Sequence, residues 1–200
     1  MAVSACNDFS LVVAEDGTLF AFGKNDKGQL VGGTPVGLPH DPKPRPIDRC
    51  TWFGGQAIHM VSGKNNHCAC VTTNGSVYTW GEFRFGALAM DPLDPIVQGT
   101  LKTHCIPRVS YGNVPALMVA CGCNFTMLLT ATGCVWTCGF GGKGQLGIGL
   151  REHYYSSHVL ELLDTDDFRK TPVTFISAGG NHAMALQEGD GSLWAWGCNI

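Results

Sequence analysis

The chain has 200 residues, of which 44% are hydrophobic and 14% are charged, a composition typical of a globular protein and not of a disordered one. Its net charge of -3 and pI near 6.1 argue against the basic surface that nucleic-acid-binding proteins present. No apolar run approaches the roughly 18 residues of a membrane helix, and the N-terminus lacks the features of a signal peptide. We therefore expect a cytoplasmic or nuclear protein that contacts neither nucleic acid nor membrane directly.

The predicted elements come in pairs of short apolar segments. In chain order the pairs cover residues 9–14 and 19–22, 67–72 and 77–80, 125–130 and 135–138, and 182–187 and 193–196. In the second segment of each pair, aliphatic, aromatic and small residues alternate with a period of two, which is typical of a β-strand. Neither face of these strands carries charge, so we expect both faces to be buried.

A dipeptide rich in glycine separates the two strands of each pair: Asp16-Gly17, Asn74-Gly75, Thr132-Gly133 and Asp190-Gly191. Asp-Gly and Asn-Gly between apolar runs predict a tight hairpin in which both central residues take positive φ. The fourth connection has one additional residue, for which we expect a bulge at Gly189.

Glycine, with 27 residues, is the composition's outlier, and its spacing reveals a repeat. Within each of three glycine columns, successive members are 58 residues apart. The columns are Gly17, Gly75, Gly133 and Gly191; Gly23, Gly81, Gly139 and Gly197; and Gly28, Gly86 and Gly144. We expect these glycines to be structural. A repeat of this length indicates blades or coils that bury their faces against one another, as in a propeller.

Gly142, Gly144 and Gly147 also match the spacing G-x-G-x-x-G of nucleotide-binding loops. That fingerprint should open a helix after a strand, but the next residues, "IGLREHYYSS", show no helical periodicity. The equivalent stretches of the other repeats, "NDKGQLV" and "FRFGALA", also lack the pattern. The sequence therefore favours a turn of the repeat over a phosphate-binding loop.

The whole pattern resembles the RCC1 repeat, named for the regulator of chromosome condensation. It consists of small-x-Gly-x-x-His, a hairpin Asp-Gly, and then aromatic-Trp-Gly-x-Asn-x-x-Gly-Gln-Leu-Gly. Asn25 and Asn199 keep the asparagine after the glycine, whereas Phe83 and Gly141 depart from it, and the second repeat reads "GALA" in place of "GQLG". The resemblance covers essentially the whole chain.

The resemblance implies an all-β fold of RCC1-type β-propeller blades. The chain holds three complete repeats of 58 residues and part of a fourth, at approximately 1–58, 59–116, 117–174 and 175–200, in a single region 1–200. Because the family's propeller has seven blades, and would need about 400 residues at this period, we expect an incomplete ring and a fragment of a longer propeller. Self-association through the open end blades is expected, since terminal repeats need polar caps.

The cysteines and histidines suggest structural roles. Cys68 and Cys70, like Cys121 and Cys123, are spaced too closely for a typical zinc site. Cys68, Cys70 and Cys134 align with small or apolar residues of other repeats, which favours packed thiols over metal ligands. His67 and His182 both begin a strand, where a structural hydrogen bond is the favoured role. We assign no catalytic, cofactor-binding or metal-binding residue.

Three loops remain as candidate binding elements. The segment "PKPRP" at 42–46 could serve as a polyproline ligand, although a rigid connection between strands is favoured. The acidic segment 164–167 could bind a basic partner through Asp164, Asp166 and Asp167, although a solvated loop is more common. The connection 91–111 is another long loop, and long loops on a rigid scaffold often carry binding sites.

Three functions follow from the resemblance, and none requires a cofactor. The first is a non-enzymatic protein-interaction module within a larger regulatory protein. The second is a guanine-nucleotide exchange factor for a Ran-type small GTPase, and the third is the substrate-targeting propeller of a HECT-type ubiquitin ligase. A UV-B photoreceptor is disfavoured, because the stretches "GKNNH" and "GGNHA" lack the tryptophan of that branch's "GWRHT" segments.

Overall fold

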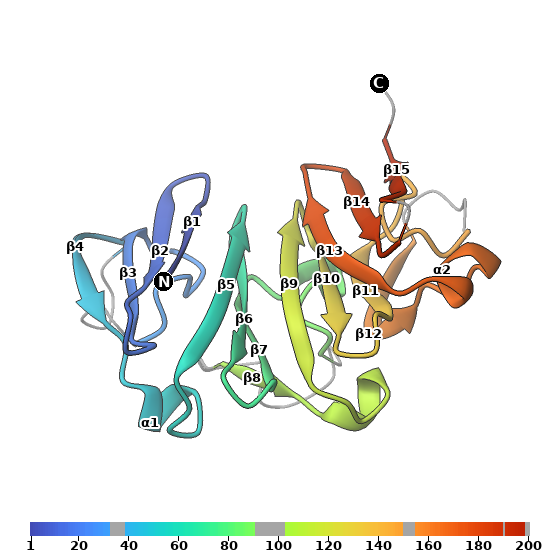
Figure 1. Cartoon of the computed structure of the whole chain (residues 1–200). Helices are drawn as coiled ribbons and strands as arrows, with labels where there is room; N and C mark the ends of the chain where they lie inside the picture. Colours follow the sequence, from blue (N-terminus) through green and yellow to red (C-terminus); the bar gives the residue numbers. More distant parts are fainter. Residues whose placement is uncertain (33–38, 91–102, 150–154, 190, 199–200) are drawn as a thin grey trace.

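A computed structural model describes residues 1–32, 39–90, 103–149, 155–189 and 191–198 as four antiparallel sheets arranged in an open arc (Figure 1). This confirms the expected all-β fold of propeller blades and an unclosed ring. The first sheet holds β1 (Ala2–Ala5), β2 (Phe9–Val13), β3 (Leu19–Lys24) and β4 (His40–Pro46). The second holds β5 (Ile58–Lys64), β6 (His67–Thr72), β7 (Val77–Gly81) and β8 (His104–Ile106).

The third sheet holds β9 (Ala116–Gly122), β10 (Phe125–Thr130), β11 (Val135–Phe140) and β12 (Ser156–Leu162), and the fourth holds β13 (Val173–Ala178), β14 (His182–Gln187) and β15 (Leu193–Gly197). Three helical turns lie between successive sheets: α1 (Arg49–Trp52), η3 (Arg108–Tyr111) and α2 (Asp166–Lys170). A fourth, η1 (Arg84–Gly86), lies between β7 and β8 within the second sheet. The first strands of neighbouring sheets, β1, β5, β9 and β13, contact one another along the inner side of the arc.

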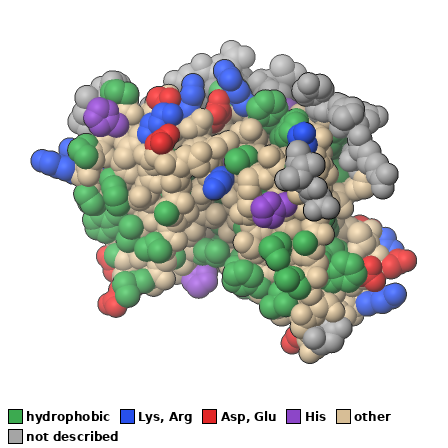
Figure 2. All heavy atoms as spheres, turned by 90° about the horizontal axis from the view of Figure 1, so that it is seen from above, with side chains coloured by type: hydrophobic (Ala, Val, Ile, Leu, Met, Phe, Trp, Pro, Cys, Tyr) green, Lys and Arg blue, Asp and Glu red, His purple; other side chains and the backbone are tan. Residues whose placement is uncertain are grey.

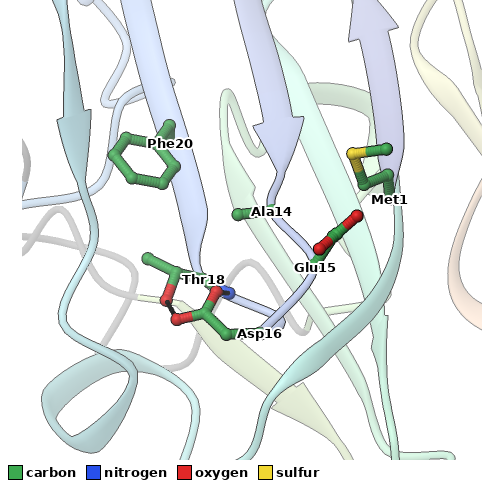
Figure 3. A pocket seen from close by; sticks show the side chains of 6 residues that line it. All are labelled: Met1, Ala14, Glu15, Asp16, Thr18 and Phe20. Carbon is green, nitrogen blue, oxygen red and sulfur yellow. Dashed lines mark hydrogen bonds between the residues drawn. The ribbon is translucent and has the colours of Figure 1, made fainter.

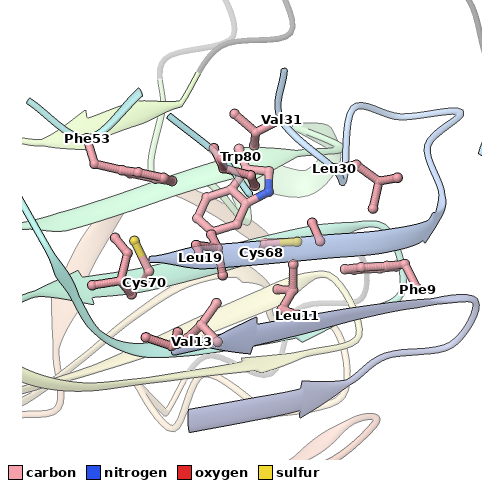
Figure 4. Close-up of a cluster of buried hydrophobic side chains, with 14 residues drawn as sticks. Phe9, Leu11, Val13, Leu19, Leu30, Val31, Phe53, Cys68, Cys70 and Trp80 are labelled. Carbon is pink, nitrogen blue, oxygen red and sulfur yellow. The ribbon is translucent and has the colours of Figure 1, made fainter. Parts of the chain in front are cut away.

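Apolar side chains fill the spaces between the sheets. The first of these cores combines residues of β2 and β3 with residues of β6 and β7, including Leu11, Leu19, Cys68 and Trp80 (Figure 4). The residues of β7 and β11 are buried or half-buried, and every residue of β6 and β10 is buried, which confirms the expected two-faced burial for the middle sheets. Because each sheet buries both faces only between two neighbours, the blades depend on one another for stability.

The fourth sheet does not follow this expectation. Leu186 and Leu193 are 36% and 61% exposed, whereas their equivalents in the third sheet, Leu129 and Val135, are at most 1% exposed. The reason is geometric, since no described sheet packs on this face of β14 and β15. The prediction that both strand faces are buried is therefore wrong for the last pair.

The hairpins differ from the predicted type. Gly17, Gly75 and Gly133 take φ of 77–78°, but the residues before them do not take positive φ. The Ala14 nitrogen donates to the Thr18 carbonyl, and the Gly17 nitrogen donates back to the Ala14 carbonyl. Each connection is thus a three-residue loop with one left-handed glycine, and a two-residue turn would need two such residues. In the fourth hairpin, Asp190 lies outside the described residues.

Candidate interaction surface

The hairpin glycines join consecutive blades. The Gly17 carbonyl accepts a hydrogen bond of 2.9 Å from the Ile58 nitrogen at the start of the next blade, and Gly75 and Gly133 bond Ala116 and Val173 in the same way. A Cβ on Gly17 would lie 2.5 Å from the Ala57 Cβ, which is closer than real Cβ atoms approach. The position therefore needs glycine both for its positive φ and for the space.

The second glycine column lies inside a strand. Gly23, Gly81, Gly139 and Gly197 take φ of 96–109°, and a Cβ on each would lie 2.3–2.5 Å from the backbone oxygen of the residue just before the preceding strand. The register of the sheet shifts at Gly23 and at Gly139, which marks a bulge there. In the third column, Gly28, Gly86 and Gly144 take φ of 76–78°. All of the predicted repeat glycines thus stand in left-handed turns or bulges, Gly191 with φ 72° included.

Two tryptophans, the buried Trp80 and the half-buried Trp196, connect their blades to the preceding one. The Trp80 Nε1 donates to the Gln29 carbonyl over 2.8 Å, and the Trp196 Nε1 donates to the Gln145 carbonyl over 2.9 Å. Between these two, the third blade has Cys138, whose Sγ lies 3.7 Å from the Ala87 carbonyl. The Gly-Gln-Leu segment of the repeat is therefore the acceptor for an indole of the next blade and not a phosphate-binding loop.

His67 forms another contact between blades. Its ring is buried, and Nε2 lies 3.0 Å from the Thr126 Oγ1, which itself donates to the Ala87 carbonyl over 2.7 Å. Because the threonine's only hydroxyl proton goes to that carbonyl, the neutral His67 donates from Nε2. Burial lowers the pKa of His67 to about 4. The expected structural hydrogen bond is confirmed for His67, while His182 is exposed.

We expect His67 to make folding sensitive to acid. Unfolded histidine has a pKa of about 6.5, so the unfolded state takes up the proton first as pH falls. The stability contribution is complete above pH 6.5 and is lost as pH falls towards about 4, a change of about 3 kcal/mol. His67→Phe, which copies Phe9 and Phe125 of the neighbouring repeats, should flatten this dependence. Urea unfolding at pH 7.5 and 4.5 measures the free energy of unfolding of both proteins. An equal loss of this free energy between the two pH values in wild type and His67→Phe would contradict the prediction.

Some of the cysteines are packed thiols, as expected. Cys68, Cys70 and Cys121 are buried, and burial raises the pKa of Cys121 to about 12, so its thiol stays protonated and unreactive. Cys134 is exposed in a hairpin, so its assignment to the core is wrong. Its position aligns with Thr18 and Ser76, which are half-buried in the equivalent hairpins. Among the described residues no group of three metal-ligating side chains occurs.

The sequence suggested that the acidic segment 164–167 is an open loop, but the structure shows that part of it belongs to a short helix. The Thr165 side chain accepts a hydrogen bond from the Phe168 nitrogen and caps α2, whose first turn contains Asp166 and Asp167. Both carboxylate oxygens of Asp164 accept hydrogen bonds from Arg169. Acidic residues at a helix start and a paired Asp164 serve local structure, while Asp166 remains 85% exposed.

We expect the double variant Asp166→Ala/Asp167→Ala to fold normally. Both carboxylates complement the N-terminal end of a short, exposed helix, and the ion pair of Asp166 with Arg169 at 3.7 Å is solvent-exposed, so the melting temperature should stay within about 3 °C of wild type. Thermal unfolding followed by circular dichroism measures this. Thr165→Ala is the matched comparison, because it removes the cap itself and should cost more. If the double variant unfolds while Thr165→Ala does not, these aspartates have a structural role that the contacts do not show.

The other predicted loops also have local structure. Residues 42–46 lie in β4, an edge strand that tolerates proline, and so do not form a free polyproline segment. Of the connection 91–111, residues 91–102 lie outside the described part, while β8 and η3 occupy most of the remainder. A shallow depression on the outer face of the first sheet contains one bonded carboxylate, Asp16, which accepts hydrogen bonds from Thr18 (Figure 3). None of these three elements gathers reactive groups in its described residues.

Exposed side chains that depart from the repeat pattern lie in and just before η1. Phe83 and Phe85 are 47% and 44% exposed, and Arg84 between them is 70% exposed at its side chain. The first repeat has Asn25, Asp26 and Lys27 at these positions, and the third has Gly141, Gly142 and Lys143. The sequence did contain this signal, but the departure at Phe83 was interpreted only as looseness of the repeat.

Sequence comparison now decides the family. The sequence profile described as "Regulator of chromosome condensation (RCC1) repeat" matches residues 74–129 and 132–186, and a second profile of the same description matches residues 2–29. The chain belongs to the RCC1 repeat family. This confirms the resemblance drawn from the glycine columns.

Several relatives contain RCC1 repeats in longer chains. The chain is 35% identical to the "Ultraviolet-B receptor UVR8" of Arabidopsis thaliana over 98% of its own length and 40% of the relative. It is 32% identical to the "Protein RCC2 homolog" of Xenopus laevis over 74% and 26%. It is also 30% identical to the human "Probable E3 ubiquitin-protein ligase HERC3" over 99% and 17%. The chain therefore spans less than half the length of these RCC1-type relatives.

Solved RCC1-type structures share the fold. Human WBSCR16 superimposes with a TM-score of 0.82 at 23% identity, over 98% of this chain and 48% of that one. Yeast RCC1 (Prp20), solved bound to Kap60, superimposes with a TM-score of 0.79 at 22% identity, over 98% and 43%. Among the described helices, none is long and apolar enough to cross a membrane.

Proposed function

We propose that this chain is a protein-interaction module, an arc of an RCC1-type propeller that presents turn residues to a protein partner in the cytoplasm or nucleus. One observation carries the proposal. The glycines that the repeats share, such as Gly17, join successive blades, and His67 and Trp80 add further contacts between blades, whereas the exposed turn residues differ between repeats. A scaffold with constant internal contacts and variable exposed turns suits recognition and not catalysis.

The proposal includes self-association through the exposed face of the fourth sheet. Leu186 and Leu193 form an apolar surface on the fourth sheet, and the equivalent surface of every other sheet is covered by a neighbouring blade. Contact between two copies through the end blades would cover it. The exchange of nucleotide on a small GTPase and the targeting of a HECT-type ligase remain hypotheses about a longer propeller. The photoreceptor hypothesis stays disfavoured by the missing tryptophans.

Site-directed photo-crosslinking in cells tests the module. A photoreactive amino acid is placed at Lys143, in a turn at one end of the blades, or at Val109, which is 80% exposed in η3. Arg108 of η3 bonds the Asn74 carbonyl in the β6–β7 hairpin, so η3 lies at the opposite end. We expect one defined protein to be captured from one end only. Equal, diffuse labelling from both ends would contradict the module, and accelerated nucleotide release from Ran would favour the exchange hypothesis.

A further inference from the structure

We propose that the segment Phe83–Phe85, together with Lys27 and Lys143 in the equivalent neighbouring turns, binds an acidic peptide segment of a protein partner through an apolar anchor residue. These five residues are called the aromatic–basic rim. This inference rests on the proposed interaction function and assigns it a surface and a class of partner. The turns follow the equivalent strands β3, β7 and β11, so they lie at the same end of three adjacent blades.

The aromatic rings of the rim are held in place and not loosely exposed. The Phe85 ring packs edge-on against Phe140 of the next blade, with centroids 5.4 Å apart and planes at 61°. The following Gly86 lies against the Ser157 backbone, and a Cβ there would come within 2.2 Å of the Ser157 oxygen. The turn is therefore fixed between two blades while nearly half of both phenylalanine side chains stays exposed.

The backbone at Phe85 adds an independent observation. Phe85 has φ of 62°, in the left-handed region, while the equivalent residues Lys27 and Lys143 do not take positive φ. A bulky residue in this region costs on the order of 1 kcal/mol, and such strain is concentrated at functional sites. The protein thus retains an unfavourable backbone conformation at the residue that presents an aromatic ring to solvent.

The charges around the rings favour an acidic partner. Lys27 and Lys143 are exposed, and neither forms an ion pair with a carboxylate among the described residues. The nearby acids are already engaged: Asp26 contacts Lys24 and Gln29, and Glu82 accepts from Asn66 and lies near Arg84. Three cations, of which Arg84 lies 3.4 Å from Glu82, therefore stand in the same three turns as two exposed aromatic rings, in a chain whose net charge is -3.

These features fit an extended acidic segment with one apolar side chain. Exposed aromatic rings that bury a partner's side chain are the usual energetic centre of an interface, and surrounding charges set orientation and specificity. Because the cations are spread over three successive turns, a chain that crosses the blades can pair its carboxylates with them in turn. Figure 2 looks onto this end of the molecule, where basic side chains lie beside both acidic and hydrophobic ones.

Peptide selection on the purified chain tests the proposal. Two displayed peptide libraries are used, both with one random apolar position, flanked either by Asp and Glu or by Lys and Arg. The main variant is Phe83→Asn/Phe85→Lys, which installs the residues that the first repeat has at these positions, Asn25 and Lys27, so the turn should fold. Val109→Asn, at the opposite end, is the matched surface control, and circular dichroism verifies folding of each protein.

We expect the acidic library to be enriched on wild type and on Val109→Asn. Binding of the selected peptides should fall about 30-fold on Phe83→Asn/Phe85→Lys, the loss typical of removing an interface anchor. Lys27→Glu/Lys143→Glu should reverse the preference towards the basic library. No enrichment, enrichment of basic peptides on wild type, or equal binding to the rim variant would overturn the proposal. The crosslinking result is independent, so a captured partner combined with a failed selection would leave the module intact and exclude this surface.

Discussion

Replacing Gly139 with valine should prevent the chain from folding. Gly139 has φ of 108°, and a Cβ at this position would lie 2.4 Å from the Asn124 oxygen and 2.6 Å from the Phe125 Cα. Both obstacles are backbone atoms of β10 or its preceding turn, which cannot move without breaking the sheet. In the same bulge, the Phe140 nitrogen donates a hydrogen bond of 2.7 Å to the Asn124 carbonyl. We expect a loss of more than about 4 kcal/mol, which exceeds what a marginally stable arc can sustain.

The control separates steric conflict from backbone conformation. Gly55 has φ of 77°, but nothing lies within 4 Å of a Cβ there. Gly55→Val therefore meets only the conformational cost of the left-handed region, about 1–2 kcal/mol. Far-ultraviolet circular dichroism and soluble yield are measured for Gly139→Val, Gly81→Val and Gly55→Val. A soluble Gly139→Val protein with an unchanged spectrum would show that the bulge is not needed for the fold.

The sequence was sufficient for the fold because the same constraint recurs at a fixed spacing. Gly23, Gly81, Gly139 and Gly197 meet the same backbone oxygen in four blades, so a single glycine column reports a three-dimensional contact. The hairpin type could not be obtained from the dipeptide alone. Asp-Gly suits a two-residue turn and also a three-residue loop that ends in a left-handed glycine, and the strand register decides between them.

The candidate surface was less predictable than the fold. Repeat columns identify what blades share, whereas a binding surface lies where they differ, and a single sequence does not separate such differences from drift. Phe83 and Phe85 became informative once the structure showed that both are exposed, and that Phe85 packs on Phe140 and has a left-handed backbone. The capping of α2 by Thr165 was readable in principle, because a threonine followed by two aspartates is a helix-start signal.

Trp80→Ala should cause the largest loss of stability among the side chains between the first two blades. Trp80 is 1% exposed, packs against Phe53 with centroids 5.7 Å apart, and bonds the Gln29 carbonyl of the preceding blade. Removing a buried tryptophan typically costs about 3–5 kcal/mol through lost packing and the cavity that remains. Because the indole contacts residues of both sheets, we expect the loss to weaken their association and not only the second sheet.

Two controls apportion this effect. Trp80→Phe keeps most of the packing and removes the indole donor, and the Cys68 Sγ at 3.8 Å remains beside the Gln29 carbonyl, so a cost of about 1–2 kcal/mol is expected. At the equivalent position of the third blade, Cys138→Ala removes much less volume, and Thr126 still donates to the Ala87 carbonyl. Urea unfolding of the three variants should rank Trp80→Ala as clearly the most destabilised. If Trp80→Ala and Cys138→Ala cost the same, the buried indole is not what holds the first two blades together.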